Sequence, residues 1–183
     1  MSVIIGQKEY FKGINQIKFE GADSDNPLAF RYYDENRMVA GKTMKEHVRF
    51  AIAYWHSFCG NGADPFGPGT HHYPWDVAGD VRQRASDKAD AAFEFITKIG
   101  APFYCFHDVD AIDQSNDPKE FSERIKFISD IFAKKQAIKN QNEILESKRV
   151  LTLLKDGGIP VLPYKGLLFL EKIYEDRKST RLN

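Results

Sequence analysis

Two short apolar runs with a helical pattern between them constrain the fold of this chain more than any other feature. Residues 50–55 are continuously apolar, which is typical of a parallel strand buried on both faces. The run 103–106 is rich in aromatic residues and predicts a second buried strand. Between the runs, Asp80 is a candidate N-cap, apolar residues recur at helical spacing over 81–99, and Gly100 ends the pattern. The sequence therefore predicts a right-handed β-α-β unit.

The polar positions of the predicted helix indicate a solvated face, formed by Arg82, Arg84, Asp87, Lys88, Asp90 and Glu94. Before the unit we expect an N-terminal arm with one short strand or hairpin in 13–33, and a short helix at 44–48 capped by Thr43 and Glu46. After it we expect two helices, a short strand and a short helix, at 117–135, 136–155, 159–162 and 167–174.

The composition excludes several classes of partner. The 183 residues suffice for about one domain, and 26 basic residues balance 26 acidic ones, so bulk charge gives no reason to expect nucleic acid or an anionic membrane. Residues 1–11 lack the pattern of a secretory leader, and no apolar run is long enough to span a membrane, so we expect a cytoplasmic protein. Cys59 and Cys105 lack C-x-x-C spacing, and buried, reduced thiols are a better interpretation than a disulfide between them.

The second apolar run ends in a histidine and two acids, and this is the strongest local indication of chemistry. His107 and Asp110 stand three residues apart on the segment that leaves the strand. A carboxylate at that spacing can turn back to accept a hydrogen bond from the imidazole Nδ1–H, which leaves Nε2 free to act on a substrate. From the spacing alone, a solvated strand end with an ordinary histidine is an equally good interpretation.

Several blocks, in the same order, resemble the xylose isomerases that have an extended N-terminal arm. The resemblance covers about residues 16–110, and the blocks that carry it are 17–21, 26–30, 50–56, 62–67 and 103–110. It implies a (β/α)8 TIM barrel that converts the small sugar xylose to xylulose with two divalent metal ions, Mg²⁺, Mn²⁺ or Co²⁺, and that assembles as a homotetramer. It also implies that His107 assists opening of the sugar ring and Asp110 orients it, that Trp55 forms an apolar wall of the sugar pocket, and that Phe66 reaches across a subunit interface.

The resemblance stops before the family's metal site. No counterpart of the metal-binding Glu, Asp and His motifs follows residue 110, and only two strands match. We therefore expect an α/β chain that begins a TIM barrel, continues as a mainly helical segment and is inactive by itself. The expected segments are an arm (1–48), a partial barrel β-α-β unit (49–110), a helical segment of uncertain origin (111–175) and a tail that resembles translated sequencing adapter (176–183).

Two other functions stay open for the later part of the chain. Residues 140–174 resemble the start of a polymerase-β-like nucleotidyltransferase, with a Lys165-Gly166 turn before the strand that bears the metal-binding aspartates in that family. ATP would be its ligand, and the domain would start at about residue 117. The alternative is a non-catalytic interaction module made of an amphipathic helix pair within 118–155.

Overall fold

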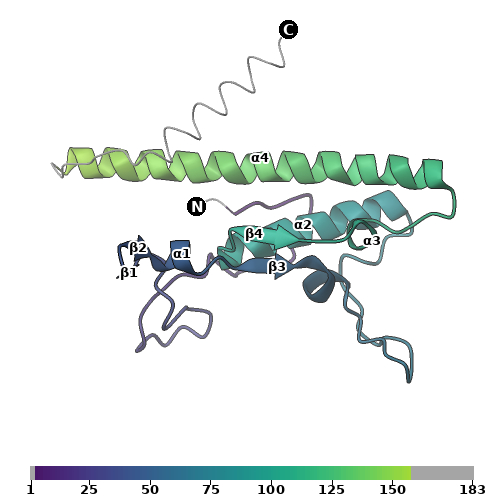
Figure 1. Cartoon of the computed structure of the whole chain (residues 1–183), viewed down its shortest axis with the longest axis horizontal. Coiled ribbons are helices and arrows are strands. Elements are labelled where there is room, and N and C mark those ends of the chain that lie inside the picture. The colour runs from purple at the N-terminus through teal and green to yellow at the C-terminus, as the bar shows by residue number, and fades with distance from the viewer. Residues whose placement is uncertain (1–2, 158–183) are drawn as a thin grey trace, which may run out of the picture. The chain divides into compact units, whose positions relative to one another are not determined.

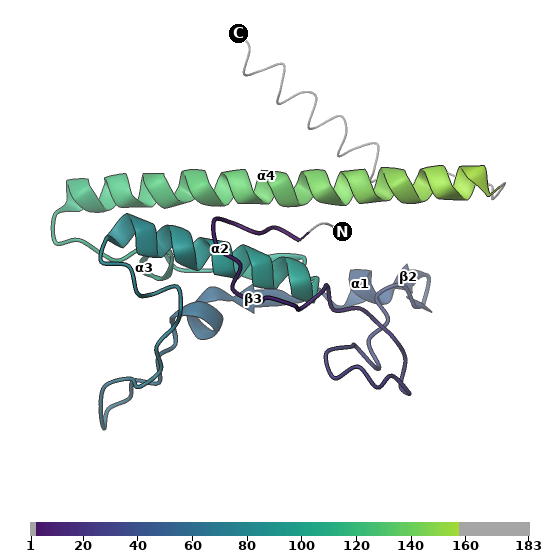
Figure 2. The same ribbon diagram turned by 180° about the vertical axis from the view of Figure 1, so that it is seen from behind.

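The computed structural model describes residues 3–157, which fall into two compact units. The first unit contains residues 3–135 and every predicted site residue, and the second begins at residue 136. Figure 1 shows two strands, β3 and β4, side by side in the first unit, and Figure 2 shows helix α2 along β3 from behind. The predicted strand at 159–162, the helix at 167–174 and the tail at 176–183 lie outside the described residues.

The predicted β-α-β unit is confirmed. β3 (Ala51–Ala53) pairs in parallel with β4 (Phe103–Cys105), with Ile52 opposite Tyr104. The connecting helix α2 (Val81–Ile99) begins after Asp80, whose side chain accepts the Gln83 N–H at 2.8 Å. It ends at Gly100, whose left-handed φ of 74° is readily available only to glycine. This is an α/β arrangement, and no barrel is formed by residues 3–157.

The prediction that both strands are buried was wrong. Phe50 and Phe103 are 51% and 41% exposed, and Phe106 is 43% exposed. In the described sheet each of the two strands has a single neighbour, so a face that a larger sheet would cover is open here. The first strand is also shorter than predicted, because the chain enters the π-helical turn η1 at Trp55–Cys59.

An aromatic cluster forms the core between the sheet and the helices. Phe93 of α2 is fully buried, and its ring lies 5.3 Å from that of Tyr104 and 5.7 Å from that of Phe132. Tyr54 and Phe58 join the same cluster, with ring centroids 5.0 Å apart. Burial of such side chains contributes about 1.5–3 kcal/mol each, so this cluster fixes the helix on the sheet.

The prediction of a solvated polar face on α2 was wrong for most of its members. Glu94 is fully buried, and its carboxylate accepts the backbone N–H of Tyr10 at 2.8 Å and of Phe11 at 3.0 Å. Lys98, one turn further on, donates to the same carboxylate at 2.6 Å. Residues 10 and 11 thus cover a helix face that α2 alone would expose to solvent, and Glu94 satisfies their N–H groups.

The same helix holds the arm at a second position nearer its N-terminus. The Asp90 carboxylate accepts the Gln7 N–H at 2.8 Å and pairs with Lys135. Asp87, 1% exposed, pairs with Lys8 at 2.8 Å. A Cβ on Gly6 would lie 1.9 Å from the Asp90 Cγ, so only glycine permits this close approach of the arm.

The rest of the arm is less regular than predicted. The 13–33 region contains an isolated bridge between Phe19 and Phe30 in place of a strand or hairpin. A short hairpin follows instead, with β1 (Met38–Val39) antiparallel to β2 (Lys42–Thr43). The predicted capped helix is confirmed as α1 (Met44–His47), in which Thr43 and Glu46 form a capping box.

The two predicted helices after the unit are one continuous helix, α4 (Pro118–Asp156). Pro118 begins it as predicted, and residues 119–156 contain neither glycine nor proline, so no residue interrupts the helix. The interaction-module alternative depended on a helix pair, which the described part of the chain does not form. The nucleotidyltransferase alternative falls partly on residues beyond 157, outside the described region. Among residues 3–157 no helix combines the length and the apolar character needed to cross a membrane.

Candidate active site

His107 and Asp110 make the contact that their spacing predicts. His107 is the N-cap of the short helix α3 (Asp108–Ala111), which follows β4 directly. The Asp110 Oδ2 accepts the backbone N–H of His107 at 2.9 Å and lies 2.8 Å from its Nδ1. Because an ionised carboxylate only accepts hydrogen bonds, this contact favours the hydrogen on Nδ1, which in the neutral form of the ring leaves Nε2 as an acceptor.

The exposure of the two side chains differs in a way that suits an acid–base pair. The imidazole is 65% exposed, whereas the carboxylate behind it is 13% exposed. The imidazole is therefore accessible to a molecule from solution, while the carboxylate that contacts it is sheltered. This arrangement can transfer one proton to or from an exposed ligand.

Trp55 lies against the imidazole. The ring centroids of Trp55 and His107 are 4.7 Å apart, and the ring planes are tilted by 39°. The parallel strands β3 and β4 lie side by side (Figure 1). Trp55 begins η1 after β3, and His107 follows β4, so both residues lie at the same end of the sheet. Catalytic side chains of parallel α/β barrels come from this end of the strands. The roles of these residues toward a sugar stay predictions.

Phe66 is not brought into this cluster. It lies on a tight turn where Asp64 accepts the N–H groups of Phe66 and Gly67 at 2.8 and 3.0 Å. Its side chain is 96% exposed, so no part of residues 3–157 covers it. The turn fixes the backbone while the phenyl ring points into solvent, as a ring that contacts another subunit would. The predicted contact across a subunit interface stays a prediction.

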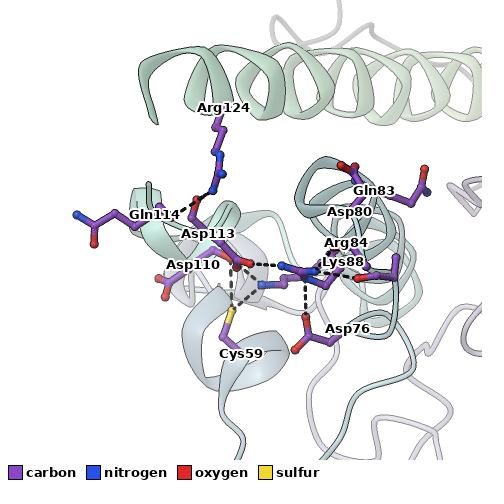
Figure 3. A network of polar contacts seen from close by, with 12 residues as sticks. Cys59, Asp76, Asp80, Gln83, Arg84, Lys88, Asp110, Asp113, Gln114 and Arg124 are labelled. Atoms are coloured by element: carbon purple, nitrogen blue, oxygen red, sulfur yellow. Dashed lines mark hydrogen bonds and ion pairs between the residues drawn. The ribbon is translucent and has the colours of Figure 1, made fainter. Parts of the chain in front are cut away.

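Behind the histidine, a polar network that the sequence analysis missed holds α3 in place (Figure 3). The main-chain carbonyl of Asp110 accepts from the Lys88 Nζ at 3.2 Å and from the Cys59 Sγ at 3.5 Å. Arg84, one turn earlier on α2, pairs with Asp113. The four-residue spacing of the two cations on one helix was a visible signal, but nothing in the sequence showed that they face α3 rather than solvent.

The thiols differ from the prediction in burial. Both cysteines are free, but Cys105 is exposed and Cys59 is only partly buried. Cys105 lies on β4, whose alternate residues face the open side of the sheet. Burial raises the pKa of the Cys59 thiol, and the nearby Lys88 ammonium offsets part of that effect.

Tyr54 is a second buried polar group beside this network. Burial raises its pKa well above the ordinary value, and the neighbouring Cys59 and Asp110 add to the shift. Its hydroxyl has no hydrogen-bond partner among residues 3–157.

The described residues do not fit a two-metal centre. Within residues 3–157 no three His, Cys, Asp or Glu side chains gather closely enough to hold a metal ion. Hard divalent cations require several oxygen ligands in one place. The metal chemistry that the resemblance implies therefore has no ligand set in this part of the chain.

Comparison with known proteins agrees with the motif resemblance. The chain is 61% identical over 136 residues to xylose isomerase 2 of Xanthomonas campestris pv. campestris (strain 8004) and 60% identical to xylose isomerase 1 of the same strain. It is 59% identical over 133 residues to xylose isomerase 1 of Xanthomonas axonopodis pv. citri (strain 306). These matches cover 73–74% of this chain but only 30% of each relative. No family model matches the chain. Over about three-quarters of its length, this chain is similar to a part of the xylose isomerases.

Proposed function

We propose that the chain carries the ring-opening portion of an aldose–ketose isomerase that acts on xylose. The observation that supports this most is the contact of Asp110 with His107 Nδ1, at 2.8 Å, beside the ring of Trp55. These residues lie in the part of the chain that shares about 60% identity with proteins named xylose isomerase. A histidine oriented by an acid and backed by an aromatic ring suits proton transfer on a small sugar.

The chemistry assigned to the pair is the opening of a cyclic hemiacetal. Nε2 of His107 accepts the proton of the anomeric hydroxyl, and the electron pair of that O–H bond forms the C1 carbonyl. The bond from C1 to the ring oxygen breaks, and the ring oxygen takes a proton from water. The imidazolium returns its proton to the hydroxide that remains, so His107 is neutral again at the end of the step. Asp110 stabilises the imidazolium that forms, and Trp55 covers the less polar face of the sugar and limits access of water.

The isomerisation that would follow ring opening is not assigned to this chain alone. The family performs it with two divalent metal ions, and residues 3–157 offer no ligand set for them. We therefore expect no xylulose from xylose and the purified chain, with or without added Mg²⁺ or Mn²⁺. Metal-dependent formation of xylulose would contradict this part of the proposal.

Phe66 and the homotetramer of the family belong to the same proposal. A phenyl ring that is 96% exposed on a turn fixed by Asp64 is a suitable contact for a second subunit. Such a contact would place the ring over the sugar pocket of the neighbouring subunit and exclude water from it.

Ring opening can be tested on the full chain because it needs no metal. The interconversion of freshly dissolved α-xylose with its β-anomer is followed by proton NMR, with His107→Gln and Asp110→Asn as variants. His72→Gln is the matched control, because it removes an exposed loop histidine and leaves the pair intact.

We expect the wild type and the control to accelerate anomer interconversion equally. His107→Gln should lose that acceleration, and Asp110→Asn should lose most of it. Positioned acid–base groups accelerate reactions by about 10²–10⁴-fold. Because His107 is exposed to solvent, we expect the acceleration here to lie at or below the lower end of that range. If His107→Gln is as fast as the folded wild type, the ring-opening assignment is wrong.

A further inference from the structure

The helix that carries Asp110 is too short to hold its own position. α3 contains four residues, and isolated helices shorter than about 12 residues are marginal in water. The capping-box hydrogen bond from the His107 N–H to the Asp110 Oδ2, at 2.9 Å, sets the direction of the carboxylate within this segment. The position of α3 itself must be held by contacts with the rest of the fold.

Asp110 is held through both its side chain and its main chain. Its carboxylate contacts Nδ1 of His107 at 2.8 Å, whereas its main-chain carbonyl accepts from the Lys88 Nζ at 3.2 Å and the Cys59 Sγ at 3.5 Å. Figure 3 shows Lys88 reaching from α2 to this segment, with Cys59 beside it. A change at the carbonyl would rotate the peptide plane and turn the carboxylate away from the imidazole.

Lys88 is an unusual partner for a carbonyl because it is nearly buried. Its exposure is 8%, and none of the ion pairs found in residues 3–157 includes it. A buried ammonium without a carboxylate is costly, and lysine is almost never buried in that state. Core packing alone would be served better by an apolar side chain at this position.

The neighbouring residues add support on the same side of α3. Ala111 and Ile112 are each 1% exposed, and Arg84 pairs with Asp113. These contacts locate the segment, but among residues 3–157 only Lys88 and Cys59 donate to the carbonyl of the residue that orients His107.

We propose that Lys88 is a positioning residue for the His107–Asp110 pair: by holding the Asp110 carbonyl, its ammonium fixes the turn that aims the carboxylate at Nδ1. The inference rests on the proposed function in assigning His107 as the acting group. Its test reads the geometry of the pair directly and does not depend on any activity.

The test is the tautomer of the His107 ring, read from the ¹⁵N shifts of its side chain in the labelled full chain at neutral pH. We expect Lys88→Met to lower the ratio of the Nδ1–H to the Nε2–H form about fivefold, as for loss of one hydrogen bond. Lys88→Arg keeps a cation within reach and should restore the wild-type ratio. Lys98→Met is the matched control, because it removes a buried cation of α2 that contacts Glu9 and the Phe11 carbonyl of the arm.

An unchanged ratio in folded Lys88→Met overturns the proposal, and so does an equal change in Lys98→Met. If Lys88→Met does not fold, Lys88→Gln takes its place, because its neutral, shorter side chain cannot span the contact. An unchanged ratio there also overturns the proposal. A shift of the ratio in a chain that fails to accelerate anomer interconversion supports the positioning role and rejects the ring-opening function.

Discussion

Replacement of Glu94 by glutamine tests how the N-terminal arm is held on α2. The Glu94 Oε1 accepts from the Phe11 N–H at 3.0 Å and from the Lys98 Nζ at 2.6 Å, while Oε2 accepts from the Tyr10 N–H at 2.8 Å. Glutamine has one acceptor oxygen, and its amide nitrogen is a donor. One backbone N–H must therefore face another donor, and Lys98 loses its buried counter-charge.

The magnitude follows from these losses. A buried N–H left without a partner costs about 1–3 kcal/mol, and a hydrogen bond to a charged group contributes about 1.5–3 kcal/mol. Detachment of the arm lets water reach these groups and limits the sum, so we expect Glu94→Gln to lower the free energy of unfolding by about 3 kcal/mol. This value agrees with the lower end of the cost of breaking a buried ion pair, about 3–5 kcal/mol.

Urea unfolding of the full chain measures the change, with Glu123→Gln as the matched control because Glu123 is exposed on α4. At an m-value of about 1–3 kcal/mol/M, the midpoint should fall by about 1–3 M, while the control stays near the wild type. Hydrogen exchange should accelerate at the N–H groups of Tyr10 and Phe11 before it does so in the core. A loss below about 1 kcal/mol, or unchanged exchange at these two groups, would refute the assigned role of Glu94.

Three further predictions concern groups near the candidate site. Tyr54→Phe removes a hydroxyl that is buried without a partner in the described residues, so the free energy of unfolding should stay equal or rise by about 1 kcal/mol. Because burial raises the folded-state pKa of Tyr54, the unfolded chain loses that proton first, and wild-type stability should fall above about pH 10, less steeply in the variant. Denaturation by urea at several pH values checks both the stability of Tyr54→Phe and the pH dependence of the wild type. A clear loss of stability in Tyr54→Phe at neutral pH would contradict the first of these. In timed alkylation, Cys59 should react at least about tenfold more slowly than exposed Cys105, because burial raises the pKa of the Cys59 thiol; equal rates by peptide mass analysis would count against this.

The parts of the fold that the sequence predicts are those set by local chemistry. The cap at Asp80, the stop at Gly100 and the capping box of Thr43 and Glu46 each depend on residues within one turn, and all three are present. The contact of His107 with Asp110 is local in the same sense, since three residues separate them. Local signals fail in α4, where an apparent boundary at 135–136 contains no residue that ends a helix.

The burial of the polar residues of α2, which the sequence does not predict, depends on contacts between residues far apart in the chain. Glu94 and Phe11 are separated by 83 positions, and the charges on α2 resemble a solvated surface until the arm covers them. The same holds for Lys88, whose partner Asp110 lies 22 positions later. Periodicity shows that a position is polar, but it does not show which segment will bury it.

The charged residues of α2 lie on two sides of the helix and contact two different segments of the chain. At about 100° per residue, Asp87, Asp90 and Glu94 project on one side of the helix, whereas Arg84 and Lys88 project on the adjoining side. The first side holds the arm, and the second holds α3 behind the candidate site. Ala89, Phe93 and Ile96 project on the remaining face and are fully buried.

One helix therefore connects the stability of the arm with the geometry of His107 while keeping the two separable. Loss of the Glu94 contacts should free the arm without moving Asp110, because the cations that hold α3 lie on the other side of α2. Loss of the Lys88 contact should move Asp110 without freeing the arm. Independent effects of the two changes are what the helical spacing requires, and strong coupling between them would mean that α2 moves as a whole when either contact is broken.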